Sequence, residues 1–131
     1  MKELVLKAES YAIVGACIAV HNVLGQGFLE SVYQEAVEIT FNKEAIPNER
    51  EKELNISFNG QLLEKKFYVD FLCYDQIIVE LKAVKALDQN HEAQVINYIN
   101  ASNKPLGMLI NFGEKPLVYK RLINKYHNSF N

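Results

Sequence analysis

The sequence predicts an α/β fold in which helices flank a mixed β-sheet. Apolar residues recur at helical spacing near the start of the chain and again after Asp88, whereas they alternate with polar residues in the middle. The expected order of elements is α, α, β, β, β, α, β, β. Because tight turns join the first three strands and a helix separates the third from the fourth, we expect a three-stranded antiparallel meander, a crossover helix and further strands.

The first part of the chain is expected to form two helices. In the first, the residues at helical spacing are Ile13, Cys17, Val20 and Leu24. Gly25-Gln26-Gly27 would end it, and the second helix is expected over residues 29 to 43. The apolar residues that this second helix should turn toward the core are Val32, Ala36, Val37 and Ile39.

The middle of the chain has the period of strands. Alternation at residues 54, 56 and 58 precedes Asn59-Gly60, a strong hairpin signal, and the returning strand is expected over residues 62 to 72. After a turn at Tyr74-Asp75, residues 77 to 84 form a strand so apolar that both its faces should be covered. A helix from Asp88 to about residue 103, a strand over 106 to 112 and a short strand over 117 to 121 complete the prediction.

Length and composition indicate one soluble domain over residues 1–131. The chain is 49% hydrophobic, yet no apolar run approaches the ~20 residues that span a bilayer. Met1-Lys2-Glu3 does not begin a secretory signal, so we expect a cytoplasmic protein with no membrane partner. Cys17 and Cys73 are expected to be buried thiols, and the absence of a CxxC pair argues against structural zinc.

Charge excludes a strongly basic nucleic-acid binder, because the formal net charge is −2. The charges are unevenly placed, however. From Ala83 onward six Lys and Arg residues outnumber three acids, which permits a modestly positive face near the C-terminus. An ordinary solvated surface is the alternative interpretation.

Charged residues inside an apolar strand point to chemistry. Glu80 and Lys82 share one face of the strand over residues 77 to 84, because strand side chains alternate with period two. Asp70 lies in the preceding strand and would stand opposite Glu80 in one hairpin register. Two carboxylates that close would raise each other's pKa unless a cation lay between them.

A hard dication, Mg²⁺ or Mn²⁺, suits this arrangement, with Asp70, Glu80 and the Leu81 main-chain carbonyl as oxygen ligands. Lys82 would then orient a water or stabilise charge on a phosphate. Two other interpretations stay open. Glu80 and Lys82 could pair at a sheet edge with Asp70 on the surface, and Glu30 could simply suit the positive end of a helix dipole.

Several separated motifs resemble the GxxExxY family of small bacterial and archaeal proteins, which is grouped with the PD-(D/E)XK nucleases. The naming motif corresponds to Gly27-Phe28-Leu29-Glu30-Ser31-Val32-Tyr33. The resemblance extends from about Tyr11 to Arg121 and takes in the segments around residues 79 to 82, 91 to 98 and 109 to 113. It implies a restriction-endonuclease-like fold and a nucleic-acid substrate.

The resemblance also implies roles for single residues. Asp70 and Glu80 correspond to the metal-binding acids, Lys82 to the motif lysine, and Glu30 to an acid that the first core helix supplies to the site, where it would serve the metal and catalysis. Gln94 resembles a glutamine that follows the ExK strand in several branches. We expect Tyr98 and Tyr33 to contact the substrate, although Gln94 and Tyr98 could instead form a polar helix face. Val69 stands where the family name has proline.

The leading hypothesis is therefore a Mg²⁺- or Mn²⁺-dependent nuclease that acts on DNA, with RNA as a second substrate. The alternative is a non-catalytic nucleic-acid-binding or protein-interaction module that retains the nuclease fold. A chain this short could need a homodimer or a partner protein to supply its binding surface.

Overall fold

The computed structural model describes residues 5–127, so Met1-Lys2-Glu3 lies outside the described residues. Within that range one five-stranded sheet has the order β1-β2-β3-β4-β5, with β3 and β4 parallel and the other neighbours antiparallel. The elements are α1 (Lys7–Leu24), α2 (Glu30–Lys43), β1 (Asn48–Phe58), β2 (Gln61–Cys73), β3 (Ile77–Lys82), α3 (Gln89–Ser102), β4 (Leu106–Asn111) and β5 (Val118–Ile123). The predicted fold class, with its meander and crossover helix, is confirmed.

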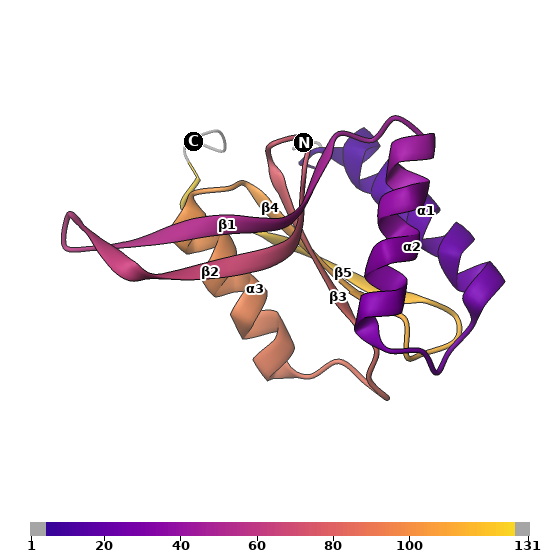
Figure 1. Cartoon of the computed structure of the whole chain (residues 1–131). Coiled ribbons are helices and arrows are strands. Elements are labelled where there is room, and N and C mark those ends of the chain that lie inside the picture. Colours follow the sequence, from indigo (N-terminus) through magenta and orange to yellow (C-terminus); the bar gives the residue numbers. More distant parts are fainter. Residues whose placement is uncertain (1–4, 128–131) are drawn as a thin grey trace.

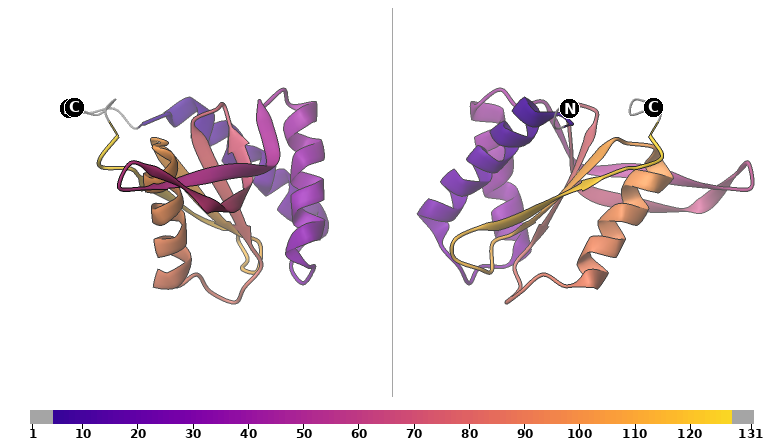
Figure 2. Two further views of the ribbon diagram at one scale, coloured as in Figure 1. Left: turned by 60° about the vertical axis from the view of Figure 1, so that its left-hand side comes forward. Right: turned by 180° about the vertical axis from the view of Figure 1, so that it is seen from behind.

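The helices cover both faces of the sheet. Figures 1 and 2 show α1 and α2 side by side on one face and α3 on the other. The larger core cluster lies under α1 and α2 and includes Tyr33, Phe71 and Phe112, whereas Ile78 and Ile99 belong to a smaller cluster that α3 covers. Both predicted thiols are buried. No helix among the described residues is long and apolar enough to cross a membrane.

The expected core face of α2 is partly wrong. Val32 and Ile39 are exposed to 37% and 62%, whereas Tyr33, Val37 and Phe41 are fully buried. The buried residues follow one another at intervals of four, and the buried face also includes Gln34. The aromatic rings at 33 and 41 fill more of the space under the helix than Val32 or Ile39 could, so the helix turns that face to the sheet.

The β1–β2 hairpin projects from the body as an arm (Figure 1). Phe58 pairs with Gln61 across Asn59 and Gly60, whose φ angles of 50° and 79° are those of a tight hairpin turn. Phe58 and Leu62 near the tip are 63% and 61% exposed. The hairpin prediction at Asn59-Gly60 is therefore confirmed.

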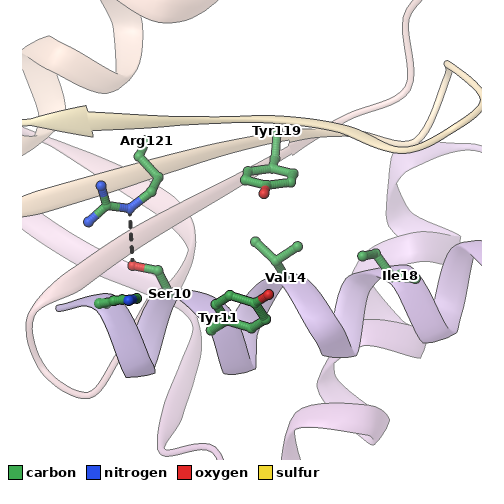
Figure 3. Close-up of a pocket in the computed structure, with 7 residues that line it drawn as sticks. Ser10, Tyr11, Val14, Ile18, Tyr119 and Arg121 are labelled. Carbon is green, nitrogen blue, oxygen red and sulfur yellow. Dashed lines mark hydrogen bonds between the residues drawn. The ribbon is translucent and has the colours of Figure 1, made fainter. Parts of the chain in front are cut away.

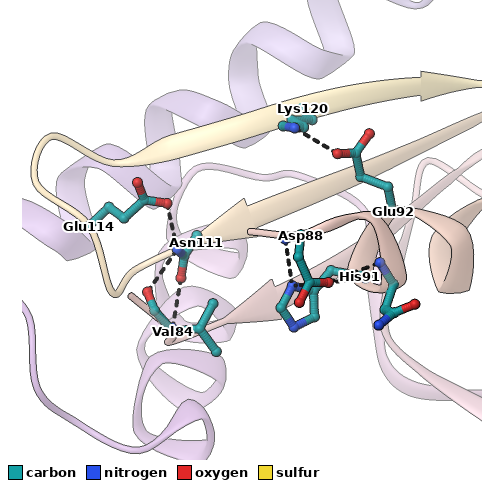
Figure 4. Close-up of polar contacts among 8 residues, drawn as sticks. Val84, Asp88, His91, Glu92, Asn111, Glu114 and Lys120 are labelled. Carbon is teal, nitrogen blue, oxygen red and sulfur yellow. Dashed lines mark hydrogen bonds and ion pairs between the residues drawn. The ribbon is translucent and has the colours of Figure 1, made fainter. Parts of the chain in front are cut away.

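Polar contacts fix the outer elements around the sheet. Figure 3 shows α1 below β5, where Nε of Arg121 donates to Oγ of Ser10 at 3.3 Å. These residues, with Tyr11, Val14 and Tyr119, line a cavity of about 240 Å³. On the other face, Lys120 of β5 pairs with Glu92 of α3 at 2.7 Å (Figure 4).

The turn after β4 lies tightly against the end of β3. Asn111 is buried, donates to the Val84 carbonyl at 2.9 Å and accepts from the Val84 N–H at 3.0 Å (Figure 4). A Cβ atom on Gly113 would lie 2.1 Å from the Val84 carbonyl oxygen, so only glycine fits there. These contacts hold the chain that follows Lys82.

Candidate metal and catalytic site

The site lies where β2 and β3 separate. Their backbone pairing runs from Cys73–Ile77 to Phe71–Val79 and stops there, so Asp70 and Glu80 are the next positions on the two strands. Side chains replace the backbone ladder at this point. The Glu80 carboxylate accepts from the Asp70 N–H at 2.5 Å, and the Asp70 carboxylate accepts from the Leu81 N–H at 2.8 Å. Each carboxylate thus bonds to the main chain of the opposite strand.

Glu80 belongs to a central strand and not to a sheet edge. β3 pairs with β2 on one side and with β4 on the other, and Glu80 is only 6% exposed. The interpretation of Glu80 and Lys82 as a sheet-edge pair is therefore wrong. Asp70 is half-buried beside Glu80 and is not an ordinary surface residue.

Burial and mutual repulsion raise the pKa values of both acids. Burial is the largest cause for Glu80, whose pKa rises to about 8, and the charge of Asp70 raises it further. The pKa of Asp70 is also raised, first by burial, although the Leu81 N–H opposes the shift. Two neighbouring carboxylates with raised pKa values, one buried and one half-buried, favour a bound proton or a bound cation.

Three further charges act on this pair. The Lys82 ammonium lowers the pKa of both acids, whereas the Glu30 carboxylate raises both. Glu30 is exposed in the first turn of α2, which also agrees with the helix-dipole interpretation. Glu51 was not predicted. It has a left-handed φ of 50°, lies on β1 between the residues that pair with Phe71 and Val69, and raises the pKa of Asp70.

Gln34 and Arg50 are the other site residues that were not predicted. Gln34 is 7% exposed, and its Nε2 donates to Oδ1 of Asp70 at 3.3 Å. Arg50 donates from Nη2 to Oε1 of Gln34 at 3.2 Å and from Nη1 to Oε1 of Glu38 at 3.1 Å. Residues 30, 34 and 38 follow one another at intervals of four, which places them on one helix face and was the available signal.

The other expected residues differ in their distance from the acids. Tyr98 of α3 stacks on Phe67 with ring centroids 4.6 Å apart. Its pKa is raised, first by burial and then by the charges of Glu80 and Asp70, so it lies near the site. Gln94 is exposed one turn earlier, and no hydrogen bond joins it to a site residue within residues 5–127.

Tyr33 has a structural environment. It is fully buried and stacks on Phe112 with ring centroids 4.5 Å apart. Its hydroxyl donates to the Gly25 carbonyl at 2.6 Å and accepts from the Phe28 N–H at 3.3 Å, so it ties the loop before α2 to the core. No exposed surface remains for a substrate, and we leave Tyr33 out of the proposed site.

The donor set suits a hard dication held by few protein ligands. No group of three His, Cys, Asp or Glu residues in the described part of the chain is placed to hold a metal ion. Glu80 provides a buried carboxylate and Asp70 a half-buried one, and Mg²⁺ typically uses one or two carboxylates together with waters and substrate phosphate. The residues therefore fit a cation that keeps part of its water shell.

Comparison with known proteins agrees with the fold described above, a mixed β-sheet flanked by helices. The sequence profile of the PD-(D/E)XK nuclease superfamily matches residues 7–122. Among solved structures, the chain is similar to the protein described as "Crystal structure of SSO0001", with a TM-score of 0.58 and 16% sequence identity. That match covers 95% of this chain and 63% of the other, so this chain spans less than two thirds of the other protein's length. No curated protein matches the sequence.

Proposed function

The chain belongs to the PD-(D/E)XK nuclease superfamily, and from that premise we propose that it hydrolyses phosphodiester bonds with the help of Mg²⁺ or Mn²⁺. One observation carries the proposal. The buried Glu80 carboxylate and the half-buried Asp70 carboxylate meet where β2 and β3 separate, with the Lys82 ammonium close enough to lower the pKa of both. Without a cation or a proton, that arrangement would cost folding free energy.

The roles follow from the positions. Asp70 and Glu80 would hold the cation, the Leu81 carbonyl would add a main-chain oxygen, and Glu30 would bind through water or orient solvent. A dication bound there would supply an acidified water and would offset phosphate charge. Lys82 would orient the attacking water or stabilise charge that develops on the phosphate. Tyr98, at the border of the site on α3, would contact the substrate.

Finer assignments belong to the same proposal. We propose DNA as the substrate, with RNA as the second choice, and membership of the GxxExxY group within the superfamily. We also propose that residues 1–131 form a single domain, that the protein works in the cytoplasm, and that Gln94 takes part in catalysis.

One observation favours a second function, a non-catalytic binding module. Phe58 and Leu62 are exposed near the end of the hairpin arm, on opposite faces of it, because Phe58 pairs with Gln61 and Leu62 with Ser57. Large apolar side chains exposed in this way would give a partner protein or a second copy of the chain apolar contacts on either face of the arm. Such a module would bind nucleic acid or protein and leave phosphodiester bonds intact.

Cleavage of single- and double-stranded DNA and RNA, with Mg²⁺ or Mn²⁺, tests the proposal. Lys82→Ala should slow cleavage by about 10²–10³-fold, the usual loss for a charge-stabilising group. Glu80→Gln should abolish cleavage because it removes a cation ligand. Lys120→Ala is the matched control, because this lysine pairs with Glu92 two strands away from β3.

Cleavage at the wild-type rate by purified Glu80→Gln would overturn the proposal. Salt-dependent nucleic-acid binding with no cleavage by the wild type, across both metals and all four substrates, would instead favour the binding module.

A further inference from the structure

We propose that Arg50 and Gln34 are positioning residues that fix the Asp70 carboxylate for metal binding. The inference rests on the proposed function, because it assigns the support of the same metal site. Neither residue contacts the proposed cation or substrate, and both act through Asp70. A chain of hydrogen bonds supports this inference; it joins Glu38 of α2 to Arg50 of β1, returns to Gln34 of α2 and ends at Asp70 of β2.

The chain of contacts is continuous. Glu38 of α2 accepts from Nη1 of Arg50, and Nη2 of Arg50 donates to Oε1 of Gln34. The Nε2 group of Gln34 then donates to Oδ1 of Asp70. Arg50 reaches this position because its strand pairs it with Phe71, the neighbour of Asp70.

Arginine determines which way the Gln34 amide points. A guanidinium group only donates hydrogen bonds, so the amide must turn its oxygen toward Arg50 and its N–H₂ group toward Asp70. Without Arg50 the amide could flip and direct its oxygen at the carboxylate, which would repel it. Because Gln34 is 7% exposed, water offers little alternative to these partners.

The Asp70 carboxylate is therefore held at both oxygens. Oδ1 accepts from Gln34 and Oδ2 accepts from the Leu81 N–H, and these two donors lie on different elements, α2 and β3. Each oxygen retains a further lone pair for a cation. A carboxylate held in one rotamer loses less entropy when it binds a metal, and outer partners of this kind typically change metal affinity by about 10–100-fold.

A purely structural role makes a different prediction. If Arg50 and Gln34 only joined α2 to β1, their loss would lower the melting temperature and leave metal affinity unchanged. Electrostatics alone makes a third prediction, because removal of the positive charge of Arg50 would strengthen cation binding. Weaker binding in an Arg50 variant therefore points to positioning.

The test is Mn²⁺ affinity, measured by calorimetry on the full chain, together with the melting temperature of each variant. Gln34→Met removes both amide bonds without a change of charge and should weaken Mn²⁺ binding about tenfold. Arg50→Met should weaken it as well, and the double variant should lose little more, because both act through one contact. Arg50→Lys retains a donor for Oε1 of Gln34 and should recover most of the affinity.

Two control variants separate the possible failures. Lys120→Met breaks an ion pair between β5 and α3, two strands away from β3, and should leave Mn²⁺ affinity unchanged. Affinity within about twofold of wild type in both Gln34→Met and Arg50→Met would overturn the positioning role alone. If Asp70→Asn binds Mn²⁺ as tightly as wild type, or if the wild type does not bind Mn²⁺, the proposed metal site itself is wrong and the positioning role falls with it. If Gln34→Met does not fold, the more exposed Arg50→Met decides the question.

Discussion

At the scale of single residues, two effects act in opposite directions on the pKa values of the acids in the site. Glu80 is buried and Asp70 half-buried, which disfavours their charged forms, yet each accepts a hydrogen bond from a main-chain N–H, which favours those forms. Burial prevails, since both pKa values are raised. The metal-free protein therefore carries acids that are stabilised best by a proton.

This gives a pH dependence with a definite sign. The pKa of Glu80 is about 8 in the folded chain, against an ordinary 4.5, so the folded state binds more protons than the unfolded state between these values. The stability that this group contributes is fully present below pH 4.5 and is lost as pH rises toward 8. Asp70 shifts in the same direction.

Glu80→Gln removes this titration, so its unfolding free energy should fall less between pH 5 and 8 than that of the wild type. Urea denaturation in the presence of EDTA measures the difference between the two proteins. Parallel curves across that range would show that Glu80 does not bind its proton more tightly when folded.

At the scale of elements, the turn after β4 packs closely against the chain that follows β3 and so fixes the end of the strand that holds Lys82. Gly113→Ala should destabilise the protein by about 3 kcal/mol, because its Cβ would meet the Val84 backbone at 2.1 Å. Gly15→Ala on α1 is the matched control, since no atom lies within 4 Å of that Cβ. It should stabilise by about 0.5–1 kcal/mol. Chemical denaturation measures both, and equal effects would contradict the close approach.

The elements themselves were largely predictable from sequence. Alternation around Ile56, the turn at Asn59-Gly60 and the apolar strand that holds Glu80 all specify local structure through side-chain period and turn chemistry. The orientation of α2 was not predictable in the same way. Val32 and Tyr33 can both face a core, and only packing against Phe112 decides which of them is buried.

The sequence alone indicated the charged residues of the site, but it did not indicate the contacts that support them. Asp70, Glu80 and Lys82 are conspicuous as charges among apolar residues. Arg50 lies in a run of alternating charges, Glu49 to Glu53, where nothing distinguishes it from a solvated strand. Its contact with Gln34 depends on how α2 packs against β1, a tertiary property that local sequence does not encode.

At the scale of the whole molecule, cation binding and folding are linked. A cation held by Asp70 and Glu80 in the native state alone should raise the melting temperature in Mg²⁺ or Mn²⁺. At a hundredfold excess over the Kd, the stabilisation is about 2.7 kcal/mol, which corresponds to a shift of several degrees. Thermal melts measure this shift, Asp70→Asn should abolish it, and Ca²⁺-free buffer with EDTA gives the baseline. Equal shifts in wild type and Asp70→Asn would place the cation elsewhere.

The contact between β2 and β3 has one more consequence. The amide hydrogens of Asp70 and Leu81 are held by carboxylates instead of carbonyl groups. A proton or a cation that neutralises those carboxylates also changes the strength of these two hydrogen bonds. The rate at which the two amide hydrogens exchange with solvent deuterium should change with it. Amide exchange at these two residues should therefore report whether the site is empty, protonated or occupied by a cation.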